Sequence, residues 1–191
     1  MGGDEAEWVA RCRAGDLSGL EALYRRYVER VWRYGWFRTR SRESAAEIAQ
    51  ETFLRVARSI ASFEGRSTFS TWLFAITRAV TIEHTRRERR ERETFTGPTV
   101  LRLVPAVEAP DSLEAGDARE AVRRAVSELP GAQRDVVVLC EYSGCTMHEA
   151  AQAMGWGESR VKVTLHRARR RLREALRGFV AGDNVRAAGG K

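Results

Sequence analysis

A single long stretch without helical periodicity divides this sequence into two halves. It covers residues 94–116 and contains three of the four prolines, Pro98, Pro105 and Pro110. Its charged residues are mostly acidic, whereas the segment before it, residues 86–92, is basic. Prolines and a change of charge are typical of a boundary between domains. We therefore expect four segments: a domain over 1–93, a flexible linker over 94–116, a second domain over 117–178 and a disordered tail over 179–191.

Apolar residues recur at spacings of three and four in both halves, which is the period of amphipathic helices and predicts an all-α fold. In the N-terminal half this pattern predicts helices over about 4–14, over about 18–37, from a capping box at Ser44-x-x-Glu47 onward, and over about 70–91, with a loop over 62–68. The inward stripe of the second helix consists of Leu20, Leu23, Tyr24, Tyr27, Val28 and Val31.

The C-terminal half contains a helix-turn-helix pattern. Two helices precede it, one that ends before Pro130 and one that starts there, because proline suits the first position of a helix. Thr146-x-x-Glu149 then matches a second capping box, which opens a short helix. Gly155-Trp156-Gly157 predicts a tight turn before a last helix over about 158–177. A helix-turn-helix alone specifies only DNA binding.

The last helix separates its apolar and charged residues by face. Its core positions are Val161, Leu165, Ala168, Leu172 and Leu176, and the remaining positions carry eight cations and only two acidic residues. Such a helix suits the DNA major groove, where its first residues reach base edges and later arginines neutralise phosphates. A solvated charged face is the alternative interpretation. The position after a capped helix and a tight turn favours DNA.

The net charge of +7, from 33 basic and 26 acidic residues, favours a polyanionic partner. Nucleic acid is the first candidate and an acidic membrane surface the second. The longest strongly apolar run, residues 136–140, is far too short to span a bilayer, so we expect no membrane insertion. Residues 1–7 carry three acidic side chains and do not resemble a secretion signal, and we therefore expect a cytoplasmic protein.

The three cysteines, Cys12, Cys140 and Cys145, do not form a disulfide framework and fit a reducing compartment. Cys145-x-x-His148 could be part of a zinc site, but no fourth ligand is apparent nearby, so no metal is expected. A redox or metal-sensing role for Cys140, Cys145 or His148 stays open. The sequence shows no phosphate-binding glycine loop and no nucleophile with a partnered base. We expect neither an enzyme nor a cofactor.

Motifs in both halves resemble the extracytoplasmic-function sigma factors of bacterial RNA polymerase. Those that resemble region four are Leu129-Pro-Gly-Ala-Gln-Arg134, Thr146-x-x-Glu149-Ala-Ala, Val161-Lys162 and Arg167-Ala-Arg169-x-x-Leu172-Arg173. Those that resemble region two are Arg13-Ala-Gly-Asp16, Leu23-Tyr24, Gln50-Glu-Thr-Phe-Leu-Arg55 and Phe63-x-Gly-x-Ser67-x-Phe69-x-Thr71-Trp72-Leu73. Their order and spacing match over nearly the whole chain outside the linker and the tail.

The resemblance implies three sets of binding residues. The set that docks on the polymerase comprises Glu47, Gln50, Glu51 and Phe53. The set that holds a flipped base and phosphates of the minus-ten element comprises Phe63, Arg66, Ser67, Thr68, Trp72, Arg78, Arg86 and Arg87. The set that faces the minus-thirty-five element comprises Ser159, Arg160, Lys162, Val163, His166, Arg167 and Arg170. Ordinary structural roles are the alternatives for Phe53 and Trp72, as core residues, for Glu47, as part of a helix cap, and for His166, as a solvated side chain.

The sequence departs from the family pattern at three positions. Glu47 replaces the usual aspartate, Ala79 replaces a common asparagine that would face the promoter, and Gly157 replaces a serine cap, an exchange that glycine tolerates. The resemblance implies an alternative sigma factor that binds core RNA polymerase and promoter DNA and is held inactive by an anti-sigma factor. A stand-alone helix-turn-helix regulator is the alternative.

Overall fold

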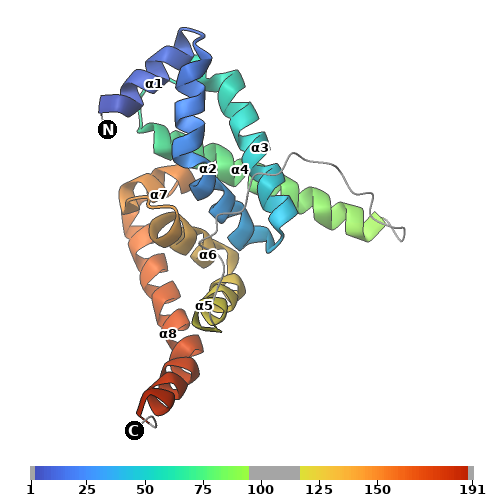
Figure 1. Ribbon diagram of the computed structural model, residues 1–191, viewed down its shortest axis with the longest axis vertical. Coiled ribbons are helices and arrows are strands. Elements are labelled where there is room, and N and C mark those ends of the chain that lie inside the picture. The colour runs from blue at the N-terminus through green and yellow to red at the C-terminus, as the bar shows by residue number, and fades with distance from the viewer. Residues whose placement is uncertain (1–2, 95–116, 189–191) are drawn as a thin grey trace.

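The computed structural model describes residues 3–94 and 117–188, and every regular element within these ranges is helical (Figure 1). The N-terminal half contains α1 (Gly3–Arg13), α2 (Leu17–Thr39), α3 (Arg42–Ser59), the 3-10 helix η1 (Ile60–Ser62) and α4 (Phe69–Thr94). The C-terminal half contains α5 (Asp117–Glu128), α6 (Gly131–Val137), the π-helical turn η3 (Val138–Tyr142), α7 (Met147–Met154) and α8 (Glu158–Ala188). The predicted all-α fold is confirmed.

The N-terminal half is a helical bundle in which α2 packs against α1, α3 and α4. Leu23, Tyr27 and Val31 of the predicted stripe are buried. Tyr24 belongs to the same predicted stripe but is 36% exposed, and it sets the edge of its ring against Phe53 of α3, with 4.8 Å between the ring centroids. The predicted inward stripe is therefore confirmed at Leu23, Tyr27 and Val31, whereas Tyr24 lies at its solvent-exposed edge.

The start of α3 differs from the prediction. The sequence pattern placed a capping box at Ser44 and Glu47, but α3 begins at Arg42, and its N-cap is Ser41. The Ser41 hydroxyl accepts a hydrogen bond from the backbone N–H of Ser44 at 3.0 Å. The Ser44 hydroxyl instead donates to Glu88 of α4 at 2.6 Å. The prediction is wrong because Ser41 offers the same capping chemistry three residues earlier.

Gly35 of α2 makes a close approach to α3. A Cβ atom at this position would lie 3.2 Å from the Cα of Ala45 and 3.3 Å from Ile48. Because protein interiors are close-packed, a larger side chain here forces the two helices apart.

We expect Gly35→Val to lower the free energy of unfolding by about 2 kcal/mol, as overpacked sites in other cores do. Chemical denaturation measures the change. Gly157→Ser is the control, because a Cβ at Gly157 meets nothing within 4 Å and serine is a good N-cap. If Gly35→Val and Gly157→Ser unfold at the same denaturant concentration, the close approach of α2 to α3 at Gly35 is contradicted.

The helix-turn-helix of the C-terminal half is confirmed, including its capping box. The Thr146 hydroxyl accepts from the Glu149 N–H at 3.1 Å, and the Glu149 carboxylate accepts from the Thr146 N–H at 2.9 Å. Gly155 ends α7 with a φ of 65°, a left-handed conformation that favours glycine. The Gly157 carbonyl accepts from the Arg160 N–H at 3.0 Å in the first turn of α8.

The helix α8 is longer than predicted. It continues to Ala188, so residues 179–188 are helical where we expected a disordered tail. That expectation relied on the glycine and alanine content of the segment, but alanine is the strongest helix former of all residues. The predicted linker, apart from Thr94 at the end of α4, lies outside the described residues.

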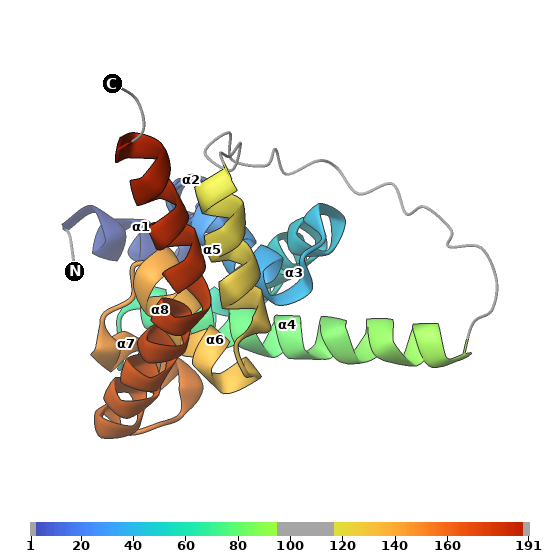
Figure 2. The same cartoon turned by 90° about the horizontal axis from the view of Figure 1, so that it is seen from below.

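The two halves pack directly on each other (Figure 1, Figure 2). Helix α7 lies against α4, while α5, α6 and η3 lie against α2. Buried side chains from both halves form one continuous apolar cluster. At the contact, the ring centroids of Phe37 on α2 and Tyr142 on η3 are 4.3 Å apart. The sequence pattern predicts two domains but not this packing between them.

Candidate nucleic-acid and polymerase interfaces

The first four turns of α8 carry the side chains that were predicted to face duplex DNA. All of them are exposed: Ser159, Arg160, Lys162, Val163, His166, Arg167 and Arg170. The core positions Val161, Leu165 and Ala168 are buried. The predicted separation of faces is confirmed, and the DNA contacts themselves stay a prediction.

Arg160 stacks on Trp156, which lies in the turn before α8. The guanidinium carbon is 3.9 Å from the centroid of the Trp156 ring, a cation–π contact. The backbone N–H of Trp156 donates to the Ala151 carbonyl at 2.8 Å and fixes the turn. A stacked arginine loses less conformational freedom when it binds a base edge. Sequence analysis assigned Trp156 to the turn only, although its spacing of four from an arginine was a usable signal.

We expect Trp156→Ala to weaken the binding of this protein to duplex DNA about two- to fivefold, the size of an exposed cation–π contact. Trp156→Phe keeps an aromatic ring and should lose less. Fluorescence-anisotropy titration of a labelled duplex measures both losses. If phenylalanine and alanine weaken binding equally, the ring does not position Arg160.

The later cations of α8 also have partners. Arg169 pairs with Glu141 of η3, and Arg170 lies 3.8 Å from Glu174. These pairs are exposed, and exposed pairs contribute little to stability. Both arginines can therefore exchange a carboxylate for a phosphate at small cost.

The loop between η1 and α4 has an aromatic floor. Phe63 is 7% exposed, and its ring centroid lies 5.0 Å from that of Trp72 and 6.2 Å from that of Phe69. A cavity of about 110 Å³ adjoins this floor and is lined by Glu5, Ala6, Val9, Arg13, Phe63, Glu64, Gly65 and Phe69. Phe63 was predicted to contact DNA, but its ring lies in the core. Trp72 is half-buried in the same cluster, which agrees with its alternative interpretation as a core residue.

The rim of this loop is polar. Arg66 is exposed and pairs with Glu64 at 2.5 Å. The Thr68 hydroxyl lies 3.0 Å from that of Ser70 and 2.9 Å from that of Thr71, and it accepts the Thr71 N–H at 3.2 Å. We call Thr68, Ser70 and Thr71 the hydroxyl cluster. Hydroxyl groups both donate and accept hydrogen bonds, but Ser70 and Thr71 are buried, so within the cluster only the half-buried Thr68 is open to a base edge or a phosphate oxygen.

The three arginines predicted on α4 do not form one row. Arg78 and Arg87 are nine residues apart, which places them on opposite faces of a helix. The Nε of Arg78 lies 3.8 Å from Asp135 of the C-terminal half, whereas Arg87 lies 3.3 Å from Glu47 of α3. Arg86 is exposed. Arg78 and Arg87 therefore lie on different faces of α4, and the phosphate contacts of the three arginines stay a prediction.

The residues predicted to dock on the polymerase meet at a groove between α3 and α4. It has a volume of about 560 Å³ and is lined by Glu47, Ile48, Gln50, Glu51, Leu54, Arg55, Val80, Glu83, His84 and Arg87. Phe53 does not line it and is only 6% exposed, which agrees with its alternative role as a core residue. Leu54, which the sequence analysis missed, is 43% exposed at this groove. The signal was its helical spacing from Glu47, Gln50 and Glu51.

Polar contacts hold α3 and α4 together along this groove. Arg55 of α3 makes a bidentate contact with Glu83 of α4, at 2.6 and 3.1 Å. His84 is buried, with its Nε2 3.2 Å from Glu88 and its Nδ1 3.0 Å from Arg87. The groove is therefore preformed, and a partner that binds there loses little conformational entropy.

Cys140 is partly buried, Cys145 is buried and His148 is exposed. Burial raises the pKa of Cys140 to about 11 and that of Cys145 to about 12, so both remain protonated thiols at neutral pH. His148 lies 2.5 Å from Glu158 at the start of α8. Among residues 3–94 and 117–188, no group of three possible metal ligands is present.

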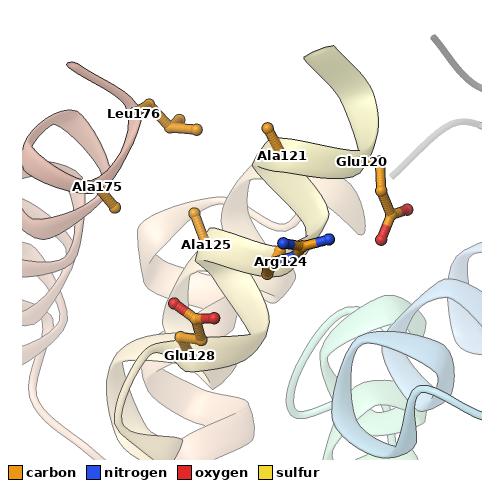
Figure 3. A pocket seen from close by; sticks show the side chains of 7 residues that line it. All are labelled: Glu120, Ala121, Arg124, Ala125, Glu128, Ala175 and Leu176. Atoms are coloured by element: carbon orange, nitrogen blue, oxygen red, sulfur yellow. The ribbon is translucent and has the colours of Figure 1, made fainter. Parts of the chain in front are cut away.

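A second groove lies between α5 and α8 (Figure 3). It has a volume of about 400 Å³ and is lined by Glu120, Ala121, Arg124, Ala125, Glu128, Ala175 and Leu176. Leu176 was predicted at a core position but is only half-buried. Figure 3 shows that the α5 residues lining the groove with it include Ala121 and Ala125, whose side chains are small.

Comparison with protein families matches both halves of the chain. Sigma-70 region 2 matches residues 23–91, and Sigma-70, region 4 matches residues 119–172. RNA polymerase sigma factor YlaC of Bacillus subtilis is 30% identical over 158 residues, which are 82% of this chain and 91% of the relative. ECF RNA polymerase sigma factor SigX of the same organism is 30% identical over 175 residues, 87% of this chain and 90% of the relative.

Solved structures of other proteins share the fold, as two examples show. CnrH in complex with the cytosolic domain of CnrY has a TM-score of 0.67 and 19% identity, covering 92% of this chain and 98% of that one. The sigma factor RpoE in complex with the anti-sigma factor NepR from Bartonella quintana has a TM-score of 0.63 and 24% identity, covering 82% and 96%. Within the described part of the chain, no helix has both the length and the apolar character needed to cross a bilayer.

Proposed function

This chain belongs to the extracytoplasmic-function sigma factors of the sigma-70 family, and we propose that its two domains place core RNA polymerase on promoters by binding two DNA elements at once. Region 2 comprises α1 to α4, and region 4 comprises α5 to α8. The observation that carries the proposal is that one molecule has two different candidate surfaces, one suited to DNA and one suited to the polymerase. One is the exposed cationic start of α8, and the other is the α3–α4 groove.

The start of α8 supports readout of the minus-thirty-five element. Arg160 and Lys162 lie in its first turns, where they reach base edges or adjacent phosphates in the major groove. Arg167 and Arg170 follow as phosphate contacts. Since each neutralised phosphate releases counterions, binding should weaken steeply as salt is added.

The loop of region 2 supports capture of the minus-ten element. Arg66 and Thr68 offer donors for an unstacked base, and Arg86 offers a phosphate contact. Capturing such a base offsets part of the free energy of unpairing, so strand opening needs no bond chemistry from this protein. We therefore propose an initiation factor that acts in the cytoplasm, without catalytic residues or a cofactor of its own.

An anti-sigma factor is the partner that we propose for regulation. Of the two example structures that share the fold, one is a sigma factor bound to an anti-sigma factor, and the other is a complex with the cytosolic domain of another protein. By analogy, such a partner would keep this protein from the polymerase until a signal releases it.

Promoter binding with and without core polymerase separates this function from that of a stand-alone regulator. A sigma factor should bind a promoter fragment weakly alone and at least tenfold more tightly with core polymerase, because the two sites are then engaged together. A stand-alone helix-turn-helix regulator would bind equally well in both conditions. Equal binding would overturn the proposal.

A further inference from the structure

Val163 lies on the outer face of α8, turned away from the core of region 4. Successive residues of an α-helix are about 100° apart around its axis, so Val163 points almost opposite to the buried Val161 and Leu165. Its side chain is 49% exposed. Among the α8 side chains that the structure describes, Val163 is the one large apolar residue on the exposed surface. Packing against the core therefore does not account for a valine at this position.

Polar and cationic residues surround Val163 on this face. On a helix surface, residues three and four positions apart are neighbours. The neighbours of Val163 at these spacings are Ser159, Arg160, His166 and Arg167, and all of them are exposed. Val163 therefore lies at the centre of the surface that is proposed to enter the major groove.

Two cationic side chains on the same face are engaged away from Val163. The Arg160 guanidinium stacks on Trp156 in the turn before α8, with its carbon 3.9 Å from the ring centroid. Arg170, two turns further along α8, has its Nε 3.8 Å from Glu174. The methyl groups of Val163 are therefore left uncovered between these two arginines.

Valine offers a partner a rigid apolar contact. Its side chain is β-branched, and one χ1 rotamer dominates when the residue is in a helix. The two methyl groups of Val163 therefore have nearly fixed positions and lose little conformational entropy when a partner touches them.

The major groove of DNA offers such a contact at one base. The C5-methyl group of thymine is the apolar group that the base edges present there, whereas the other groups are hydrogen-bond donors and acceptors. A valine side chain can pair with none of those polar groups. A protein surface is the alternative partner for Val163, but the surrounding cations favour a polyanion.

From this position and this chemistry we propose that Val163 reads a thymine of the minus-thirty-five element by contact with its C5-methyl group. The inference rests on the proposed function for the place of α8 on the promoter. It adds a specificity-determining residue to that function. Arg160 and Lys162 supply hydrogen bonds, and Val163 supplies the apolar contact that separates thymine from the other bases.

The test removes the methyl group from the DNA. The full-length protein with core polymerase is titrated with a labelled promoter fragment, taken from a start site that depends on this protein. Each thymine of the minus-thirty-five element, on either strand, is replaced in turn by uracil, which lacks the methyl group but keeps the pairing and the O4 acceptor. We expect one replacement to weaken binding by about three- to fivefold, the effect of burying one methyl group.

The same titration is repeated with the partner of the methyl group removed from the protein. Val163→Ala should weaken binding to the thymine fragment by at least the same factor and should lose nothing more with uracil, because both changes remove one contact. Alanine is the better helix former, so α8 remains folded. Val163→Ile keeps an apolar contact and should keep the preference for thymine.

Met147→Ala is the matched control. It removes another exposed apolar side chain of the helix-turn-helix, since Met147 is 44% exposed at the start of α7. We expect this control to prefer thymine over uracil as strongly as the native protein does.

Two results would overturn the inference. One is a minus-thirty-five element in which no replacement by uracil weakens binding, or which contains no thymine. The other is a Val163→Ala variant that keeps the native preference for thymine, because Val163 then does not contact the methyl group. If changes of base pair throughout the element leave binding unaltered, the proposed function fails as well, whereas dependence on base pairs without dependence on the methyl group overturns this inference alone.

Discussion

Replacing Arg160 and Lys162 together with alanine is expected to reduce transcription from a promoter of this factor by about 100-fold. Each side chain lies exposed in the first turns of α8, where one good base contact contributes about 1–3 kcal/mol of discrimination. A variant that lacks both contacts should therefore recognise the minus-thirty-five element hardly at all. Run-off transcription with purified core polymerase measures the effect.

The control for this variant is Arg173→Ala, Arg177→Ala. It removes the same charge from the same helix, but more than ten residues further along, roughly 15 Å or more from the first turn. We expect this control variant to weaken transcription much less, because it removes only phosphate contacts and so reduces only the salt-dependent part of DNA binding. If both double variants lose the same activity, α8 contributes charge alone, and sequence readout must lie elsewhere.

Replacing Leu54 with aspartate is expected to weaken binding to core polymerase by about 30-fold, without loss of duplex DNA binding. Leu54 is an apolar residue that is 43% exposed at the α3–α4 groove, beside Gln50 and Glu51. Central apolar residues of protein interfaces typically contribute about 2 kcal/mol or more, and a buried unpaired carboxylate adds a further cost. A binding assay with labelled core polymerase measures the change.

Leu17→Asp provides the matched control, because it makes the same substitution at another exposed leucine. Leu17 is 78% exposed at the start of α2 and does not line the groove. We expect this control to bind core polymerase as the native protein does. Equal weakening by both variants would exclude a specific role for the groove.

Local sequence signals predicted the helix-turn-helix well. The capping box at Thr146 and Glu149, the glycine turn and the buried stripe of α8 all depend on residues within a few positions of each other. The same kind of signal failed at Ser44, because Ser41 is an equally good cap and the sequence does not rank the two. It also failed at residues 179–188, which are helical although the segment contains glycine.

Helix faces decided which predicted site residues lie together. Glu47, Gln50 and Glu51 share a face with the missed Leu54, whereas Phe53 turns into the core. A motif names consecutive residues, but only some of them can point in one direction on a helix.

The packing of region 4 on region 2 could not be predicted from the pattern. Its contacts join residues that are far apart in sequence, such as Thr68 with Glu149 and Tyr34 with Asp135. Periodicity and capping signals carry no information about such pairs, since they report only local structure. Asp135 also looks like an ordinary surface residue in the sequence, although it is 5% exposed.

The most direct test of the central claim is transcription of genomic DNA by core polymerase supplied with this protein, followed by sequencing of the RNA 5′ ends. If this protein is the specificity factor, the start sites depend on the added protein and share two upstream elements, near minus ten and minus thirty-five. Start sites that are the same with and without the protein would contradict its assignment as the specificity factor.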